Sequence, residues 1–143
     1  MRLPRSAILL LALLGSPIQA SNTVAAGPDY GQAAAVVIRV CDGDTVVVDI
    51  PEYPPIIGKA IRVRLAGVNA PELRDPDPDV RRAAEGARQA MAALLPPGTA
   101  VTLTRLARDK YFRLNAVVLV AGRDAAALAG LTPDRDDAGG AAR

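Results

Sequence analysis

Three short polar segments carry the side chains whose types and spacing could do chemistry. They are 42–45 (Asp-Gly-Asp-Thr), 64–72 (Arg-Leu-Ala-Gly-Val-Asn-Ala-Pro-Glu) and 108–113 (Arg-Asp-Lys-Tyr-Phe-Arg). Carboxylate, carboxamide and backbone carbonyl oxygens are the ligands that hard cations such as Ca²⁺ take. Guanidinium groups present a fork of donors that suits a phosphate group. Together, a cation and two guanidiniums would stabilise the negative charge that builds up in a phosphoryl-transfer transition state.

Within these segments, Asp44 and Asn69 offer oxygen ligands, and Glu72 could act as a general base on a water molecule. Arg64 and Arg113 offer the phosphate donors. Each residue also has a plainer interpretation. The Asp-Gly-Asp-Thr segment is typical of a hairpin turn, Asn69 could form an Asx turn, and Glu72 and Arg64 could simply face solvent. The combination and order of the three segments are more specific than any single residue.

The composition of the 143 residues excludes several mechanisms. There is no His, so a Ser-His-Asp triad and His-ligated zinc are excluded, and acid–base chemistry must use carboxylates, Lys, Tyr or Arg. The only cysteine, Cys41, cannot form a disulfide within the chain and is interpreted as a small apolar residue at a strand end. Aromatic residues make up 3% of the chain, so we expect an aliphatic core.

Residues 1–20 are expected to be a cleaved secretory signal peptide. Arg2 and Arg5 precede a short apolar run, and a cleavage site follows Ala20. The run is too short for the roughly 20 residues of a membrane anchor. The protein is therefore expected in the periplasm or outside the cell. The chain has 17 basic and 15 acidic residues; without the two signal arginines the counts are equal, so phosphate binding would need local clusters.

The remaining chain predicts elements that would position the three segments. The segment 61–68 alternates, with Ile61, Val63 and Leu65 on one face and the arginines on the other. The segment 51–60 contains three prolines and is expected to be a loop. The predicted strands are 34–40, 45–50, 61–68, 100–107 and 114–121, and the predicted helices are 80–95 and 124–131.

Two local details complete this interpretation. Asp79 is expected to cap the first helix, and Val101, Leu103 and Arg105 are expected to share one face of the fourth strand. The element order predicts a mainly β fold with helices (α+β). It is a five-stranded, partly open OB-fold barrel with one inserted helix and a short C-terminal helix. The barrel domain would span 34–131, with a flexible lead-in at 21–33 and a disordered tail at 132–143.

Three ordered matches carry a resemblance to a known family. They are Val-x-Asp-Gly-Asp-Thr-Val at 40–46, Arg-Leu-Ala-Gly-Val-Asn-Ala-Pro-Glu at 64–72, and Asp-Lys-Tyr-Phe-Arg-x-x-Ala at 109–116. With the intervening helix, the region 34–131 resembles the staphylococcal nuclease (thermonuclease) family. The resemblance implies an OB fold, export, and Ca²⁺-dependent hydrolysis of DNA and RNA phosphodiester bonds. The implied substrate is mainly single-stranded or frayed nucleic acid, and the implied enzyme is a monomer with no membrane partner after signal cleavage.

The resemblance also implies the metal ligands. Asp44 matches a direct Ca²⁺ ligand, and Ala70 would offer its backbone carbonyl. Asn69 stands where the family usually has Asp, so the site has one negative charge fewer. A carboxamide oxygen can still bind Ca²⁺, but we expect an affinity about tenfold weaker.

The other implied roles concern the substrate. Arg64 and Arg113 match the two phosphate-binding arginines, Glu72 matches the general base, and Tyr111 matches a ring near the bound nucleotide. Phe112 occupies a place where the family commonly has Gly, so a positive φ there would strain the loop. No aromatic residue follows at 132–143, so stacking of the substrate on that side is expected to be poor.

The residues leave two other functions open. One is a non-catalytic OB-fold module that binds an oligonucleotide, another polyanion or a protein partner. The other is a truncated or degraded gene product with a marginal fold, because losing a terminal helix would uncover part of a small core.

Overall fold

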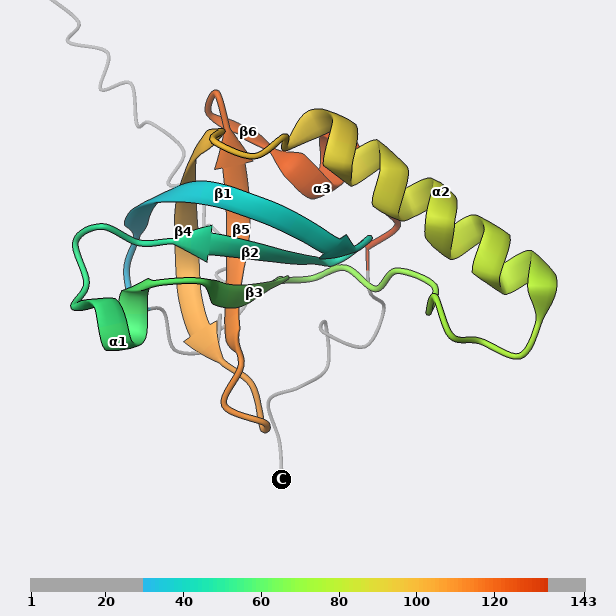
Figure 1. The fold of residues 1–143 in the computed structure, drawn as a ribbon, viewed down its shortest axis with the longest axis horizontal. Helices are drawn as coiled ribbons and strands as arrows, with labels where there is room; N and C mark the ends of the chain where they lie inside the picture. Colours follow the sequence, from blue (N-terminus) through green and yellow to red (C-terminus); the bar gives the residue numbers. More distant parts are fainter. Residues whose placement is uncertain (1–29, 134–143) are drawn as a thin grey trace, which may run out of the picture.

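A five-stranded barrel forms the centre of the computed structural model, which describes residues 30–133 (Figure 1). Each strand neighbours the next in the order β3-β2-β1-β4-β5, and a parallel pairing of β3 with β5 closes the barrel. The other pairings are antiparallel. The predicted fold class is therefore confirmed, except that the barrel is closed where a partly open barrel was predicted, and it is consistent with an OB fold. The strands are β1 Ala33–Asp42, β2 Thr45–Asp49, β3 Ile61–Leu65, β4 Ala100–Arg108 and β5 Leu114–Val120.

Two helices pack beside the barrel. The longer, α2 (Pro78–Leu94), connects β3 to β4 and lies against β1, and the short α3 (Ala125–Leu128) packs beside it (Figure 1). Two small elements of the fold were not predicted from the sequence. These are α1 (Pro55–Gly58), inside the proline-rich loop, and the two-residue β6 (Arg123–Asp124), which pairs with β5. Proline at the first position of a helix is favourable, so prolines and a short helix are compatible here.

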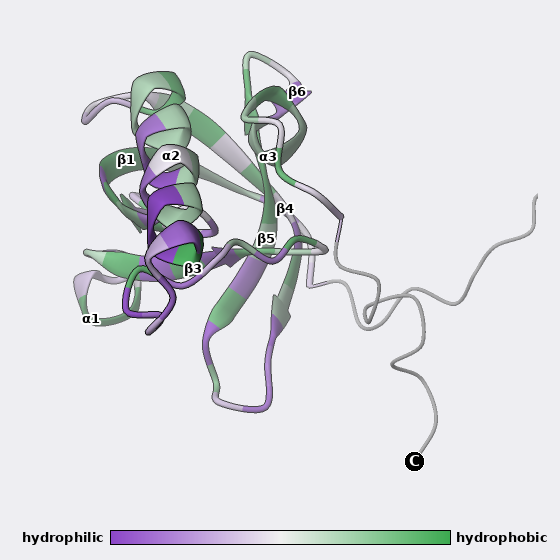
Figure 2. Cartoon of the chain, turned by 90° about the vertical axis from the view of Figure 1, so that its right-hand side faces the viewer, coloured by the Kyte–Doolittle hydropathy of each residue, from purple (hydrophilic) through white to green (hydrophobic). Residues whose placement is uncertain are grey.

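The core is aliphatic, as the low aromatic content predicts. Val63 and Leu65 of β3 are buried while Arg62 is exposed, which confirms the predicted alternation. From α2, Met91 is fully buried against the strands. Figure 2 shows the complementary pattern, with hydrophilic residues along α2 and at the tip of the β4–β5 hairpin. Burial of these apolar side chains is the main contribution that holds the strands together.

Three local predictions were wrong. Arg105 does not share a face with Leu103: it is exposed with φ 53° at a β-bulge, and Leu106 is buried in its place. The extra residue of a bulge shifts the alternation by one position. The N-cap of α2 is Asp77, whose carboxylate accepts a hydrogen bond from the backbone N–H of Asp79 at 2.8 Å. Strand β3 also ends three residues earlier than predicted, before Gly67 turns the chain with φ 71°.

Several expectations fall on other parts of the chain. The predicted signal peptide at 1–20, most of the predicted lead-in and most of the predicted tail lie outside the described residues. Between residues 30 and 133, no helix combines the length and apolar character needed to cross a bilayer.

Candidate functional site

The barrel brings the three predicted polar segments to adjoining hollows. One hollow, of about 620 Å³, is lined by the β1–β2 turn and the segment after β3, including Asp44, Asn69 and Glu72. The second, also about 620 Å³, is lined by the β4–β5 loop and the end of β3. Arg64 and Arg113 line both. The predicted site residues that line at least one of these hollows are Asp44, Arg64, Asn69, Ala70, Glu72, Tyr111 and Arg113.

Backbone contacts fix the position of the β1–β2 turn. Asp42 pairs with Thr45, so Gly43 and Asp44 form the turn itself. The backbone N–H of Leu65 donates to the carbonyl of Asp44 at 2.8 Å, which ties the turn to the end of β3. A methyl group on Gly43 would lie 2.7 Å from Cβ of Ala70 and 2.9 Å from Cβ of Ala87 in α2. The turn is therefore packed closely against the segment that carries Asn69.

Gly43→Ala is expected to destabilise the fold and displace Asp44. The added Cβ would stand 2.7 Å from the Ala70 methyl and 2.9 Å from the Ala87 methyl, both too close for carbon atoms. Overpacking of this kind costs about 1–3 kcal/mol. Urea denaturation measures the change, with Gly86→Ala as the control because a Cβ there meets nothing within 4 Å. Equal stability of Gly43→Ala and the parent would contradict the close packing.

Asp44 is the most enclosed polar side chain of the site, with 6% exposure. Its Oδ2 accepts from Arg64 Nη1 at 2.6 Å and from the Ala70 N–H at 3.3 Å, and its Oδ1 accepts from the Thr45 hydroxyl at 2.9 Å. Arg64 also donates from Nη2 to Oδ1 of Asn69 at 3.1 Å. Arg64 thus bridges the two side chains predicted to bind a cation. Ala70 contacts Asp44 through its N–H.

Asp42 belongs to the site although sequence reasoning did not select it. Its Oδ1 is buried and has no hydrogen-bond partner among the described residues. Burial, followed by the neighbouring Asp44 carboxylate, raises the pKa of Asp42. The only available sequence signal was its place as the first carboxylate of Asp-Gly-Asp. An unpaired carboxylate oxygen beside a second carboxylate is electrostatically suited to a cation.

The donor set fits Ca²⁺ in kind. Asp42 and Asp44 provide carboxylate oxygens and Asn69 a carboxamide oxygen, which are the hard ligands this ion takes. The set has few charged ligands. Within residues 30–133, no group of three or more His, Cys, Asp or Glu side chains is placed so that it could hold a metal ion. The same oxygens of Asp44 and Asn69 also serve Arg64.

Asp42→Asn is expected to raise the free energy of unfolding at neutral pH in the presence of a chelator. Because the folded-state pKa of Asp42 lies above its ordinary value of 3.8, the folded state binds this proton more tightly than the unfolded state. Stability from this group is therefore present at low pH and is lost as pH rises through the raised pKa. Denaturation at about pH 7 and about pH 3 checks this, since the gain should disappear at the lower pH. A less stable variant at neutral pH would contradict it.

Glu72 presents a free carboxylate to the first hollow. It is exposed and directly follows Pro71, and its backbone carbonyl accepts from Asp75 N–H at 3.2 Å. Within the part of the chain that the structure describes, its carboxylate has neither a hydrogen-bond donor nor an ion-pair partner. A carboxylate without a hydrogen-bond donor or ion-pair partner is free to accept a proton from a water molecule. A carboxylate that is already paired accepts one less readily.

The β4–β5 loop holds Arg113 by a compact network. The Asp109 carboxylate accepts from the backbone N–H groups of Tyr111 at 2.8 Å and Arg113 at 2.9 Å, and from Arg113 Nε at 2.6 Å. Burial opposes ionisation of Asp109, but these hydrogen bonds from Arg113 and Tyr111 outweigh it and lower its pKa. The Arg113 guanidinium also lies 5.3 Å from the centre of the Tyr111 ring. Arg113 is thereby oriented, with its terminal nitrogens left for an anion.

Phe112 adopts the positive φ that the sequence analysis considered for this position, at 61°. A left-handed conformation costs a non-glycine residue about 1–2 kcal/mol. The loop nevertheless closes, because Phe112 N–H donates to the Asp109 carbonyl at 2.9 Å and Arg108 Nη1 donates to the Phe112 carbonyl at 2.7 Å. Phe112 as a residue is 80% exposed.

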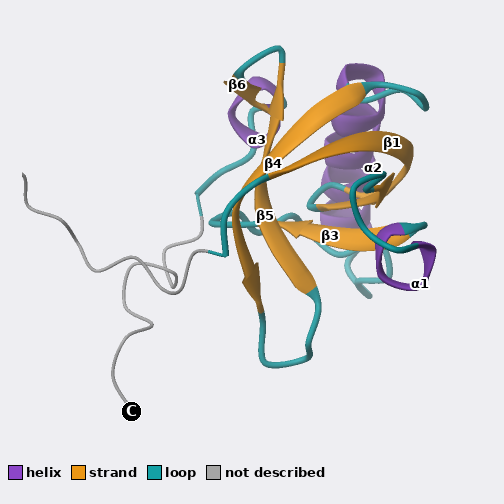
Figure 3. Ribbon diagram, turned by 90° about the vertical axis from the view of Figure 1, so that its left-hand side faces the viewer, coloured by secondary structure: helices purple, strands orange, loops and turns teal. Residues whose placement is uncertain are grey.

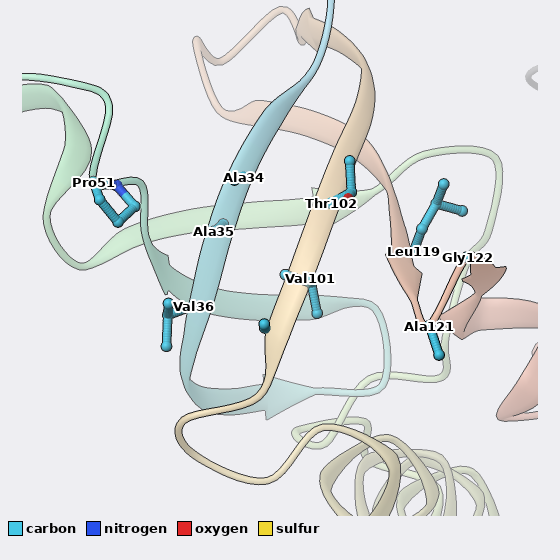
Figure 4. A pocket seen from close by; sticks show the side chains of 10 residues that line it. Ala34, Ala35, Val36, Pro51, Val101, Thr102, Leu119, Ala121 and Gly122 are labelled. Carbon is cyan, nitrogen blue, oxygen red and sulfur yellow. The ribbon is translucent and has the colours of Figure 1, made fainter.

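A further hollow, of about 370 Å³, lies over β1, β4 and the end of β5 and has a different character. Figure 4 shows the small side chains that line it, such as Val36, Thr102 and Ala121. Within the described part of the chain, none of the residues that line it is ionisable. It therefore offers no group for acid–base or phosphate chemistry.

Comparison with protein-family models and with curated proteins finds no match for this chain. The assignment of a function therefore rests on the residues and the geometry of the site.

Proposed function

We propose that this protein is an exported, calcium-dependent nuclease of the staphylococcal nuclease type, which hydrolyses phosphodiester bonds of single-stranded or frayed DNA and RNA. The observation that carries the proposal is that Arg64 and Arg113 line one hollow together with Glu72, whose carboxylate has no partner among residues 30–133. Two guanidiniums and a free carboxylate are the groups that hydrolysis of a phosphodiester by water requires.

Each residue of the chain has a distinct part in this mechanism. Glu72 accepts the proton of the attacking water molecule, so that hydroxide character develops on the water oxygen as it bonds to phosphorus. The scissile P–O bond breaks on the opposite side of the phosphorus, and the leaving oxygen takes up a proton from solvent. Arg64 and Arg113 donate to the phosphoryl oxygens, where negative charge increases in the transition state. Tyr111, a residue that is 67% exposed and lines the second hollow, offers a ring face for a base.

The proposed cation would lie at the oxygens of Asp44, Asn69 and the Ala70 carbonyl, with Asp42 beside them. When bound, Ca²⁺ supplies positive charge that offsets the charge on the phosphate. Because Arg64 bridges Asp44 and Asn69, the guanidinium is already held at the edge of this oxygen cluster. The cluster and the arginine therefore present one anionic face and one cationic face to the same hollow.

Asn69→Asp is expected to tighten Ca²⁺ binding about tenfold, because a charged oxygen replaces a neutral one. Isothermal titration calorimetry of Ca²⁺ measures this directly. Gln32→Glu adds the same charge at an exposed position of the chain away from the hollow and should leave the affinity unchanged. Equal Ca²⁺ affinities of Asn69→Asp and the parent would contradict the role of Asn69 as a ligand.

The test of the function is incubation of the full chain with end-labelled single-stranded DNA and RNA at millimolar calcium, with a chelator in the parallel reaction. Calcium-dependent shortening of the label, absent in Glu72→Ala, is the expected result. Labelled strands that stay intact in both reactions would contradict the proposal.

A second candidate function is a non-catalytic OB-fold module that binds an oligonucleotide or a protein partner. The observation that favours it is that Arg64 already donates hydrogen bonds to the oxygens of Asp44 and Asn69. These oxygens therefore have a partner without a cation. Titration of a labelled oligonucleotide with and without calcium separates the two functions. Tight binding of the oligonucleotide with the same affinity in calcium and in chelator, without cleavage, would favour the non-catalytic module.

A further inference from the structure

The four aromatic residues of the chain line two hollows beside the β4–β5 loop, and of these four only Tyr53 packs against the core. Tyr111 lines the hollow that contains Arg64 and Arg113. The other three, Tyr30, Tyr53 and Phe112, line a separate hollow of about 460 Å³. The loop thus offers two consecutive aromatic residues to two different hollows, at the tip of a hairpin that extends beyond the rest of the barrel (Figure 3).

The second hollow, which we call the aromatic groove, has open aromatic faces and a positive charge. Tyr30 is 70% exposed and Phe112 is 80% exposed. Leu106 and Leu114 add apolar surface. Among residues 30–133, Arg108 is the only charged residue that lines the groove, and no carboxylate of this part of the chain does. This combination of aromatic faces with a guanidinium is complementary to the bases and phosphates of single-stranded nucleic acid.

The backbone of Phe112 gives a second reason to regard its ring as a binding group. The residue holds φ 61°, a conformation that glycine would adopt without strain. Because the ring is mostly exposed, it adds little apolar burial that could offset this strain. Backbone strain is often found at ligand-binding positions, so the strain at Phe112 is compatible with a binding role for its ring.

We propose that the aromatic groove is a second subsite for single-stranded nucleic acid, continuing from the hollow of Arg64 and Arg113 around the β4–β5 loop. Bases stack on Tyr30 and Phe112, and Arg108 faces the phosphate backbone. The link between the subsites rests on the proposed function, since it takes the first hollow as the place of cleavage. A strand of about eight nucleotides, within the range that OB folds bind, would occupy both subsites, whereas a dinucleotide would occupy only the first.

The test compares two lengths of fluorescently labelled oligothymidylate by anisotropy, with the full chain in a chelator to prevent cleavage. Tyr30→Ala and Phe112→Gly are each expected to weaken binding of the strand of about eight nucleotides roughly tenfold, because each removes one stacking face. Binding of the dinucleotide should not change. Tyr30→Phe should retain the affinity. Ile56→Ala removes a side chain that is 91% exposed in α1, outside the groove, and should have no effect.

Phe112→Gly also guards against loss of binding by unfolding. Glycine accepts φ 61° freely, so this variant should be at least as stable as the parent while it loses the ring. Unchanged affinity for the longer strand in both Tyr30→Ala and Phe112→Gly would overturn the subsite. An equal loss for the dinucleotide would also overturn it, since the rings would then serve the first hollow.

The inference and the proposed function can fail separately. Calcium-dependent cleavage, combined with oligonucleotide affinities that do not change when Tyr30 or Phe112 is replaced, would refute the subsite alone. The groove would then be a candidate surface for a protein partner. Length-dependent binding that needs both rings, in a protein without cleavage activity, would support the subsite and refute the nuclease.

Discussion

Glu72→Gln is expected to lower the rate constant for cleavage of single-stranded DNA by about a hundred- to ten-thousand-fold, the usual contribution of a general base. Glutamine keeps the size of the side chain but cannot accept the proton of the attacking water. Binding of the oligonucleotide should change little, because the Glu72 carboxylate holds no other described residue in place by a hydrogen bond or an ion pair. Single-turnover cleavage at saturating enzyme measures the rate constant separately from binding.

The matched control is Glu52→Gln, which removes an exposed carboxylate from the loop before α1, away from the site. It should cleave at the parental rate. If Glu72→Gln and Glu52→Gln cleave at the same rate, Glu72 is not the base, and the free carboxylate in the hollow has no catalytic role.

Arg113→Lys is expected to lower the cleavage rate constant about a hundredfold, close to the effect of removing one transition-state donor. Lysine keeps the charge but lacks the planar fork that can donate to Asp109 from Nε and to a phosphate from the remaining nitrogens. It also loses the stacking arrangement of the guanidinium over the Tyr111 ring. Single-turnover rates of the two proteins check this expectation.

Arg123→Lys is the control, because Arg123 is exposed in β6 and lines neither hollow of the site. A rate close to the parent is expected for it. Should Arg113→Lys behave like Arg123→Lys, the charge near the β4–β5 loop would matter and the oriented fork would not.

The alternation in β3 was sufficient to predict which side chains enter the core. Val63 and Leu65 are buried and Arg64 faces the polar hollow, because side-chain direction in a strand follows directly from residue spacing. The convergence of the three polar segments was also predictable, since the barrel order fixes which strand ends meet. The closing pairing of β3 with β5 places the segment after Leu65 next to the β4–β5 loop.

Other features depend on contacts between segments that local patterns do not reveal. The bulge that exposes Arg105 arises where β4 fits the curvature of the barrel against β5. The Asp42 oxygen is buried in a turn whose Gly43 packs closely against Ala70 and Ala87, a contact that sequence spacing does not encode. Tyr30 lies near Phe112 only because the chain before β1 runs beside Leu106. The Tyr30 N–H donates a hydrogen bond to the Leu106 carbonyl at 2.8 Å.

The most direct test of the central claim is single-turnover cleavage of single-stranded DNA by the parent protein and by Glu72→Gln, each at millimolar calcium and again in a chelator. We expect cleavage by the parent in calcium only, with a rate at least a hundredfold above that of Glu72→Gln. No cleavage by the parent in calcium, or equal cleavage by the two proteins, would contradict it.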